Sequence, residues 1–367
     1  MTQAAQTEGI VLAWGDNAFG QLGDGTTEHR GTPAPVAGLT RVTTVVGGGG
    51  HAAALLTDGT VWCWGRNDFG QCGDGTNSHR TKPVRVSGLT NVVGLFGGGG
   101  HTLALLTDGT LWSWGHNLRG DLGDGTTEHR NTPVRVHGLE GVRAGGWGGG
   151  HGLALIEDGT VRAWGHNLFG ALGDGTTTTR LTPITVQGVC DVAHLNGGGG
   201  HSIAITSDGG YWAWGRNDRG QLGDGTIESR LTPVRIDLFD SDTKIEAVSP
   251  GYFHTMALLA DDSVWAWGNN DSGQLGDGTT DNRYRPHRLA GLRGVRTIAS
   301  GGGRNEFGPG GHSLALLADG TLSAWGLNDA GQLGDGTTIN RPRPVAVDGV
   351  EGAKSIVAAG GYNFALV

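Results

Sequence analysis

The sequence predicts an all-β protein, a seven-bladed β-propeller whose blades are four-stranded antiparallel sheets. The first observation is a repeat of roughly fifty residues, the period typical of propeller blades. The second is that each repeat contains four short strand-like runs, and no stretch has the 3.6-residue period of a helix. The third is that the two ends of the chain hold complementary parts of one repeat. The repeat is marked by seven Trp-Gly pairs, with tryptophans at 14, 64, 114, 164, 214, 267 and 325.

One complete repeat runs from Gly47 to Phe96. Asp58-Gly59 lies between two apolar runs, a pattern typical of a two-residue hairpin with a type I′ turn, which needs positive φ at both central positions. The third run carries Pro83 near its start, where a proline removes no ladder hydrogen bond. We expect the histidine-led run to be the inner strand of each blade. The four predicted strands are 51–56, 60–65, 82–89 and 91–96.

The termini predict how the ring closes. The N-terminal part begins at "GIVLAWG" and lacks a histidine-led strand of its own. The C-terminal part ends at "IVAAGGYNFALV", which has the pattern of that missing strand. We therefore expect the last strand to complete the blade that the first residues begin, so that residues 1–367 form one domain. A closed ring removes the free ends of the sheet array that promote aggregation.

Composition narrows the possible functions. Of 367 residues 73 are glycine, and the formal net charge of −9 argues against binding of nucleic acid. No apolar run is long enough to span a membrane, and the start has no signal-peptide pattern. Three cysteines without a CxxC pair indicate reduced thiols rather than disulfides or a zinc site: Cys63, Cys72 and Cys190. We expect a cytoplasmic monomer without cofactor or bound metal.

The repeat pattern "GGxxHxxAL…DGxVxxWGxNxxGQLGDGTxxxRxxPxxV" resembles the regulator of chromosome condensation repeat family. The likeness covers nearly the whole chain in seven copies, and the "GDGTTxxR" form resembles the bacterial branch of that family. The resemblance implies a seven-bladed ring. It implies no single activity, because one fold can carry many functions.

Residues that recur in every repeat are interpreted as scaffold. A ring of histidines could suggest a metal site, but a residue needed in every blade most simply supplies a hydrogen bond to buried backbone. The recurring arginines are expected to pair with the "GDGT" aspartates within or between blades, and the Trp-Gly tryptophans to fill the core between sheets. The histidines are His51, His101, His151, His201, His254 and His312, with Asn363 in the seventh place. The arginines are Arg30, Arg80, Arg130, Arg180, Arg230, Arg283 and Arg341.

Function is expected where the copies differ, in two connections that share one face. The link before the histidine is glycine-rich in most repeats, but it carries Tyr252-Phe253 in the fifth and Gly361-Tyr362 in the seventh, with an insertion at 301–311. One hypothesis is that the glycines open a cavity beside the axis and expose backbone N–H groups to a ligand. The alternative is that glycine merely fits a tight turn into the strand.

The second connection follows Trp-Gly. There the residue before the asparagine is Arg66, His116, His166 and Arg216 in four successive repeats. Each alone is typical of a solvated loop. Together they predict a polar arc around the glycine-lined half of the face, which suits an anionic or carboxylate-bearing ligand.

Three functions remain open. The first is a binding propeller that holds a protein partner or a small, possibly anionic ligand on this face, as the resemblance to a β-lactamase-inhibitor propeller also implies. Aromatic and arginine side chains suit such a surface. The binding candidates are Arg66, Arg119, Arg216, Arg219, Arg304, Phe19, Phe69, Phe169, Trp147, Tyr252, Phe253 and Tyr362.

The second function is a cofactor-independent enzyme of bacterial specialised metabolism with a deep axial pocket. His116 or His166 would be the general base and Glu306 the general acid, with Tyr252 or Tyr362 as a hydrogen-bond donor. Its anion clamp would be one of Arg66, Arg216 and Arg304. The third is nucleotide exchange on a small GTPase, which the resemblance implies but which the lack of a basic tail disfavours.

Overall fold

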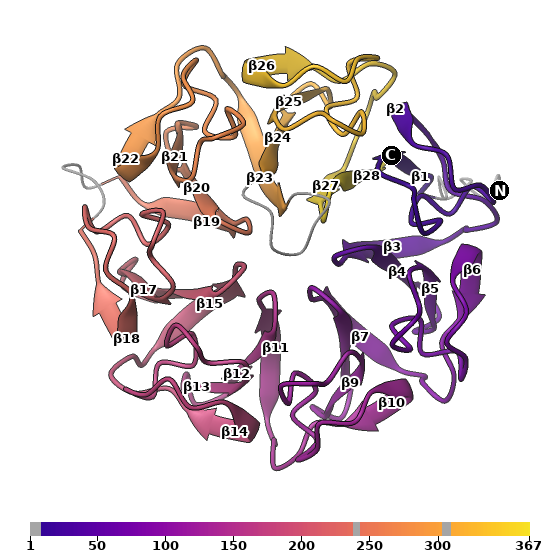
Figure 1. The fold of residues 1–367 in the computed structure, drawn as a ribbon, viewed down its shortest axis with the longest axis vertical. Coiled ribbons are helices and arrows are strands. Elements are labelled where there is room, and N and C mark those ends of the chain that lie inside the picture. The colour runs from indigo at the N-terminus through magenta and orange to yellow at the C-terminus, as the bar shows by residue number, and fades with distance from the viewer. Residues whose placement is uncertain (1–8, 238–242, 303–309) are drawn as a thin grey trace, which may run out of the picture.

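The computed structural model describes residues 9–237, 243–302 and 310–367. These residues form 28 strands in seven four-stranded antiparallel sheets arranged as a ring (Figure 1). The predicted fold class is confirmed. None of the described residues form a helix that could cross a bilayer. All three cysteines are free thiols, two of them buried.

We number the blades along the chain and give the strands of each from the axis outward. Blade 1 is β27 (Ser355–Ala358), β28 (Tyr362–Leu366), β1 (Val11–Gly15) and β2 (Arg30–Pro35). Blade 2 is β3 (Val42–Gly47), β4 (His51–Leu56), β5 (Val61–Gly65) and β6 (Arg80–Arg85). Blade 3 is β7 (Val92–Gly97), β8 (His101–Leu106), β9 (Leu111–Gly115) and β10 (Arg130–Arg135). Blade 4 is β11 (Val142–Trp147), β12 (His151–Ile156), β13 (Val161–Gly165) and β14 (Arg180–Thr185).

The remaining blades follow the same order. Blade 5 is β15 (Val192–Gly197), β16 (His201–Thr206), β17 (Tyr211–Gly215) and β18 (Arg230–Arg235). Blade 6 is β19 (Ile245–Pro250), β20 (His254–Leu259), β21 (Val264–Gly268) and β22 (Arg283–Arg288). Blade 7 is β23 (Val295–Gly302), β24 (Gly311–Leu317), β25 (Leu322–Gly326) and β26 (Arg341–Ala346).

The strand that lines the axis differs from the prediction. The histidine-led strand, such as β4, is second from the axis, and β3 lies inside it (Figure 1). The fourth run of each repeat is therefore the innermost strand of the following blade: 91–96 corresponds to β7, which pairs with β8. The narrow inner end of the wedge favours the small residues that these strands carry, such as Gly94 and Gly97.

Closure of the ring is confirmed, and it uses two C-terminal strands rather than one. β28 pairs with β1 in a register that places Trp14 opposite Asn363. β27 then pairs with β28 on the side nearer the axis. Blade 1 therefore takes two strands from each end of the chain.

The Trp-Gly tryptophans pack between blades, as predicted. Trp64 is fully buried, and its indole Nε1–H donates to the carbonyl of Gln21 in the preceding blade at 2.8 Å. The corresponding indoles of all seven blades make the same bond, at 2.8–3.1 Å. Each ring thus fills the wedge between two sheets and also joins them through a satisfied hydrogen bond.

The hairpin turn between β4 and β5 is not the predicted type I′. Only Gly59 has a positive φ, of 74°, and Asp58 does not. The Gly59 N–H donates to Leu56 O at 2.9 Å, and the Asp58 carboxylate accepts the Thr60 N–H at 3.0 Å. This is a three-residue connection in which a type I turn is followed by one left-handed glycine. The aspartate side chain, by bonding two residues ahead, favours this turn.

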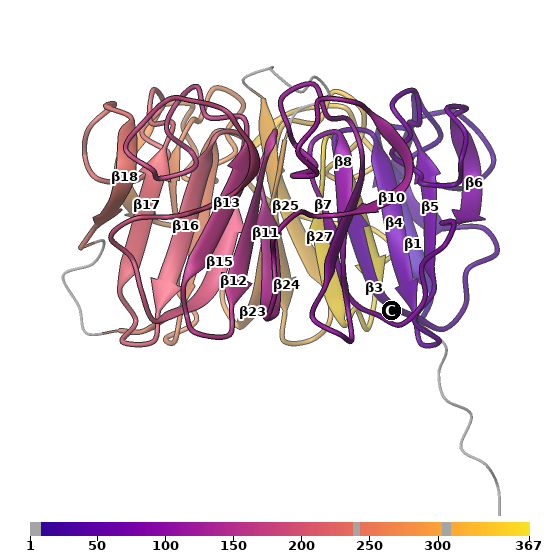
Figure 2. The same ribbon diagram turned by 90° about the horizontal axis from the view of Figure 1, so that it is seen from below.

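The two connections that vary between repeats lie on the same face, which we call the loop face. In Figure 2 this face is at the top, and the C-terminus lies at the opposite face. Strands β1, β5, β9, β13 and β17 run toward the loop face. The loops that follow them therefore emerge beside the glycine-rich turns.

Candidate binding surface on the loop face

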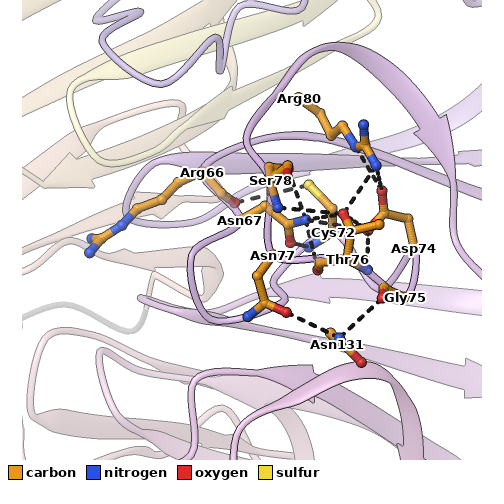
Figure 3. A network of polar contacts seen from close by, with 10 residues as sticks. All are labelled: Arg66, Asn67, Cys72, Asp74, Gly75, Thr76, Asn77, Ser78, Arg80 and Asn131. Atoms are coloured by element: carbon orange, nitrogen blue, oxygen red, sulfur yellow. Dashed lines mark hydrogen bonds and ion pairs between the residues drawn. The ribbon is translucent and has the colours of Figure 1, made fainter.

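Each loop after Trp-Gly is held by its repeated asparagine. In blade 2 the Asn67 carboxamide oxygen accepts the Cys72 N–H at 2.8 Å, and its Nδ2 donates to Asp74 Oδ1 at 3.3 Å and Thr76 O at 3.1 Å (Figure 3). Burial alone would raise the pKa of Asp74, but hydrogen bonds from Thr76 and Arg80 keep it below its usual value. Arg66, next to Asn67, points away from this network (Figure 3). The loop is thus a rigid base for its exposed side chains.

The recurring arginines pair with the "GDGT" aspartates of their own repeat, one of the two arrangements predicted. In blade 2 the Arg80 Nη2 lies 2.5 Å from Asp74 Oδ2. The same pair is present in every blade: Arg30–Asp24, Arg130–Asp124, Arg180–Asp174, Arg230–Asp224, Arg283–Asp277 and Arg341–Asp335.

Five of the six repeated histidines join neighbouring blades, but in each the bond to the next blade goes to a side chain rather than to the buried backbone that was predicted. His151 Nε2 bonds the Ser202 hydroxyl of the next blade at 2.9 Å, and that hydroxyl donates to the Ala171 carbonyl at 2.8 Å. Burial lowers the pKa of His51, His151, His201 and His254 to about 3, so these rings are neutral at pH 7. His101 faces Gly152 instead of a hydroxyl, and its Nε2 has no hydrogen-bond partner among the described residues.

The glycine-rich turns form a ring of backbone contacts around the axis. The Gly48 N–H donates to His51 O at 2.8 Å, and the Gly49 N–H donates to Gly99 O in the next blade at 2.7 Å. A Cβ on Gly99 would lie 2.4 Å from Gly149 O, so a side chain there would separate two blades. The N–H groups of Gly48 and Gly49 are therefore used within the fold, so at these two positions the hypothesis that they are exposed to a ligand is wrong.

The axial cavity at this ring is small. Its volume is about 110 Å³, and its described lining is mostly glycine, together with Pro250, Tyr252, Ser300, Ala358 and Ala359. Tyr252 closes over Gly199, whose Cβ, if present, would lie 2.5 Å from the ring. His116 and His166 are not part of the described lining. The axial acid–base pocket of the enzyme hypothesis is thus not assembled by the described residues.

The last glycine of each glycine-rich turn leaves space for a side chain of the loop that follows Trp-Gly. A Cβ on Gly100 would lie 3.0 Å from His116 Cβ, and one on Gly150 would lie 3.4 Å from His166 Cβ. Gly50 and Gly200 make room in the same way for Arg66 and Arg216. The polar arc predicted from the sequence therefore lies directly on the glycine turns.

The two ends of the arc are arginines held between aromatic rings. The Arg66 guanidinium carbon lies 5.3 Å from the ring centroids of both Phe19 and Phe69, and Arg66 also pairs with Asp68 at 2.9 Å. These are cation–π contacts supported by a neutralising carboxylate.

Arg216 repeats the arrangement in blade 5. Its guanidinium carbon lies 4.6 Å from the ring of Phe169 and 4.5 Å from that of Phe253, and it pairs with Asp218 at 2.7 Å. Both ends of the arc are therefore stacked and neutralised within the protein.

The centre of the arc differs. In blade 3 His116 Nδ1 lies 2.6 Å from Asp121 Oδ2, and the His116 ring meets Phe69 edge-on at 5.0 Å. Arg119 Nη1 lies 3.4 Å from His166 Nδ1 in blade 4. Burial, and then the positive charge of Arg119, lower the pKa of His166. A general base is often an imidazole that a buried carboxylate holds in place, as Asp121 holds His116. The described ring contacts of His116, however, are Phe69 and His129, and neither is a nucleophile that His116 could activate.

Three functional candidates were missed by the sequence analysis. Asp121 stands where five blades have glutamine, and Leu118 and Leu168 stand where four blades have aspartate. Both leucines are exposed, at 61% and 60%. Comparison of loop positions between repeats would have found all three. We call the surface formed by His116, Leu118, Arg119, His166 and Leu168 the blade 3–4 patch.

Other predicted site residues lie elsewhere. Tyr362 is fully buried, and its hydroxyl bonds the backbone of Gly48, so it belongs to the seam between blades 1 and 2. Phe253 is buried beneath Arg216, and Arg219 pairs with Asp271 at 3.7 Å. Trp147 is the last residue of β11. Arg304, Glu306 and most of the 301–311 insertion lie outside the described residues.

Comparison with known proteins identifies the repeat. A model described as "RCC1-like domain" matches residues 90–367, and one described as "Regulator of chromosome condensation (RCC1) repeat" matches 8–55 and 58–105. The chain belongs to the RCC1 repeat family. Among solved structures, this RCC1-like chain is similar to yeast RCC1 (Prp20) bound to Kap60, with a TM-score of 0.86 and 21% identity over 98% of this chain and 89% of the other. Human WBSCR16 gives a TM-score of 0.85 at 22% identity, covering 98% of both chains.

Curated relatives match this RCC1-like chain over shorter stretches. They include the human E3 ubiquitin-protein ligase HERC2, 41% identical over 27% of this chain and 2% of its own length. The zebrafish (Danio rerio) Protein RCC2 homolog is 32% identical over 35% of this chain and 25% of its own length. Mitochondrial RUG3 of Arabidopsis thaliana is 34% identical over 34% of this chain and 26% of its own length. The chain thus spans about a quarter or less of these relatives, and the solved structures, being below 25% identity, establish the fold alone.

Proposed function

We propose that this RCC1-like propeller is a binding protein that holds a protein partner on the blade 3–4 patch. The observation that carries the proposal is the exposure of Leu118 and Leu168 on adjacent loops, at a position that is aspartate in four other blades. Removing one leucine side chain from water contributes about 1.5–3 kcal/mol. An exposed apolar pair within a charged rim is the usual composition of a protein contact.

The shape of the face supports a protein rather than a small molecule. An axial cavity of about 110 Å³ is well below the roughly 300–1,000 Å³ of typical small-ligand pockets. The arc beside it is a broad surface whose side chains are held by stacking and ion pairs. Such pre-ordered side chains lose little entropy when a partner binds.

The relatives agree at the level of partner class. Yeast RCC1 (Prp20) was crystallised bound to Kap60, and another structure of Prp20p is titled for its binding to Gsp1p and histones. These partners are those of the yeast protein. For this chain they support a protein as the type of partner, in keeping with the predicted binding function.

The test is capture of partners by the immobilised full chain from a lysate of its source organism, with quantitative mass spectrometry. Leu118→Asp and Leu168→Asp are each compared with Ala18→Asp, which places the same charge at the same loop position in blade 1. We expect a protein that the wild type and Ala18→Asp both retain to fall by roughly tenfold or more with either leucine variant. Equal capture by all four proteins would contradict the proposal.

A further inference from the structure

We propose that Arg119, held by His166, recognises a side-chain carboxylate of the partner, an Asp or Glu flanked by apolar residues that contact Leu118 and Leu168. This inference rests on the proposed function and specifies the chemistry of the same surface. It depends on three features of the blade 3–4 patch: an arginine without a carboxylate partner, a histidine that holds this arginine, and a buried aspartate at a position where five other blades have glutamine.

Arg119 lies beside the arc and differs from the other described arginines there, because no described carboxylate neutralises it. Arg66 pairs with Asp68, Arg216 with Asp218, and Arg219 with Asp271. Among the described residues no carboxylate lies within ion-pair distance of Arg119, whose loop carries Leu118 in place of the aspartate. An exposed guanidinium can bind a carboxylate through two parallel hydrogen bonds.

His166 holds Arg119 in place. Because arginine is always protonated and can only donate, the Arg119 Nη1 contact at 3.4 Å makes His166 Nδ1 the acceptor. The contact orients the guanidinium, whose other N–H groups can bind a ligand. Gly150 leaves the space in which the His166 ring lies.

Asp121 holds His116 and does not make the loop hydrogen bond that glutamine makes at this position in other blades. In five blades a glutamine Oε1 accepts the N–H of the residue two positions earlier, as Gln71 does from Phe69 at 2.9 Å. Asp121 instead bonds His116 at 2.6 Å. Its side chain is only 2% exposed, and its Oδ1 has no hydrogen-bond partner among the described residues.

The position of Asp121 explains why its negative charge does not neutralise the positive charge of Arg119. The carboxylate lies beneath the surface and is held by His116, whereas Arg119 is exposed to a partner. Asp121 is therefore a positioning residue, which sets the orientation of His116 beside the carboxylate site. The glutamine bond is given up in two adjacent blades, at Asp121 and Ala171, and this local departure from the repeat indicates a local requirement.

The experiment compares two peptides on the intact chain, Ac-Ala-Leu-Glu-Leu-Ala-NH2 and its glutamine counterpart. Binding is followed through the methyl NMR resonances of Leu118 and Leu168. Because charge-assisted hydrogen bonds are stronger than neutral ones, we expect the glutamate peptide to bind roughly tenfold more tightly. Arg119→Gln should reduce that ratio to about one, and Arg219→Gln, at the equivalent loop position in blade 5, should preserve it.

Equal affinity for the two peptides, a ratio unaffected by Arg119→Gln, or no binding of either would overturn the inference. Unfolding midpoints of both variants establish that the fold is intact. These results are separable from the proposed function. Capture that depends on the leucines, without discrimination between the peptides, would leave the docking surface in place and remove only its carboxylate specificity.

Discussion

Two sets of histidines in this molecule serve opposite purposes. The repeated histidines are buried, and four of them, such as His151, are bonded to a hydroxyl of the next blade and are neutral at pH 7. His116 and His166 occur in two adjacent blades only, lie partly exposed on the loop face, and contact a buried aspartate and an exposed arginine. The comparison teaches that identity across all blades marks a need of the ring, whereas departure in neighbouring blades marks a local surface.

The largest expected effect is acid destabilisation through the repeated histidines. Burial lowers their folded-state pKa to about 3 or 4, below the unfolded value of 6.5, so the unfolded chain binds more protons between those limits. Stability is therefore complete above pH 6.5 and falls as pH decreases, by up to about 1.4 kcal/mol per pH unit for each histidine.

Urea unfolding at pH 7.5, 6.5, 5.5 and 4.5 measures this slope, and His151→Gln should reduce it. The Asp–Arg pairs do not contribute in this window, because the pKa of a carboxyl such as Asp74 is lowered and its stabilisation is lost only below about pH 3.8. A midpoint that stays constant from pH 7 to 5 would refute the scaffold assignment.

Removing one inter-blade hydroxyl should have a smaller effect. Ser202→Ala leaves His151 Nε2 without its buried partner, while the Ala171 carbonyl keeps the Trp214 indole as a donor, and the change should lower the free energy of unfolding by about 1–3 kcal/mol. Ser207→Ala is the control, because the Ser207 hydroxyl bonds Asp191 O at an exposed position. Similar losses in both variants would mean that the histidine–hydroxyl bonds do not hold the blades together.

The smallest expected effect on stability is an increase, caused by replacing Asp121. Asp121→Gln restores the glutamine of five other blades and removes a buried carboxylate oxygen without a described partner. We expect stability to rise by about 1 kcal/mol while partner capture weakens, the trade-off typical of residues kept for function. The reverse change, Gln71→Asp, should destabilise blade 2. Loss of stability in Asp121→Gln would show that Asp121 belongs to the scaffold.

The sequence predicts the fold well because every repeat carries the same tryptophan, asparagine and Asp–Arg elements. It does not determine which strand lines the axis, since β7 and β8 are both short and apolar and either could be inner. It could not place Tyr362, whose burial depends on Gly47 and Gly48 at the far end of the chain. The turn type was missed because the Asp58 side chain competes with the I′ conformation.

The candidate site was predicted in part. His116 and His166 were found from their position, and the structure places His166 against Arg119 and His116 against Asp121. The sequence shows only that three residues depart from the repeat consensus: Asp121, Leu118 and Leu168. Their roles depend on whether each side chain is buried or exposed, which the spacing of the repeat does not predict. The glycines do line an axial cavity, but the cavity is small, and the N–H groups of Gly48 and Gly49 bond within the fold instead of facing a ligand.

The central claim, that partners dock on the blade 3–4 patch, is tested most directly by site-specific photo-crosslinking. A benzophenone side chain is introduced at Leu118 in one protein and at Asp329, the same loop position in blade 7, in another. The account predicts a covalent adduct with a captured protein from position 118 and none from position 329. Adducts from 329 and none from 118 would contradict it.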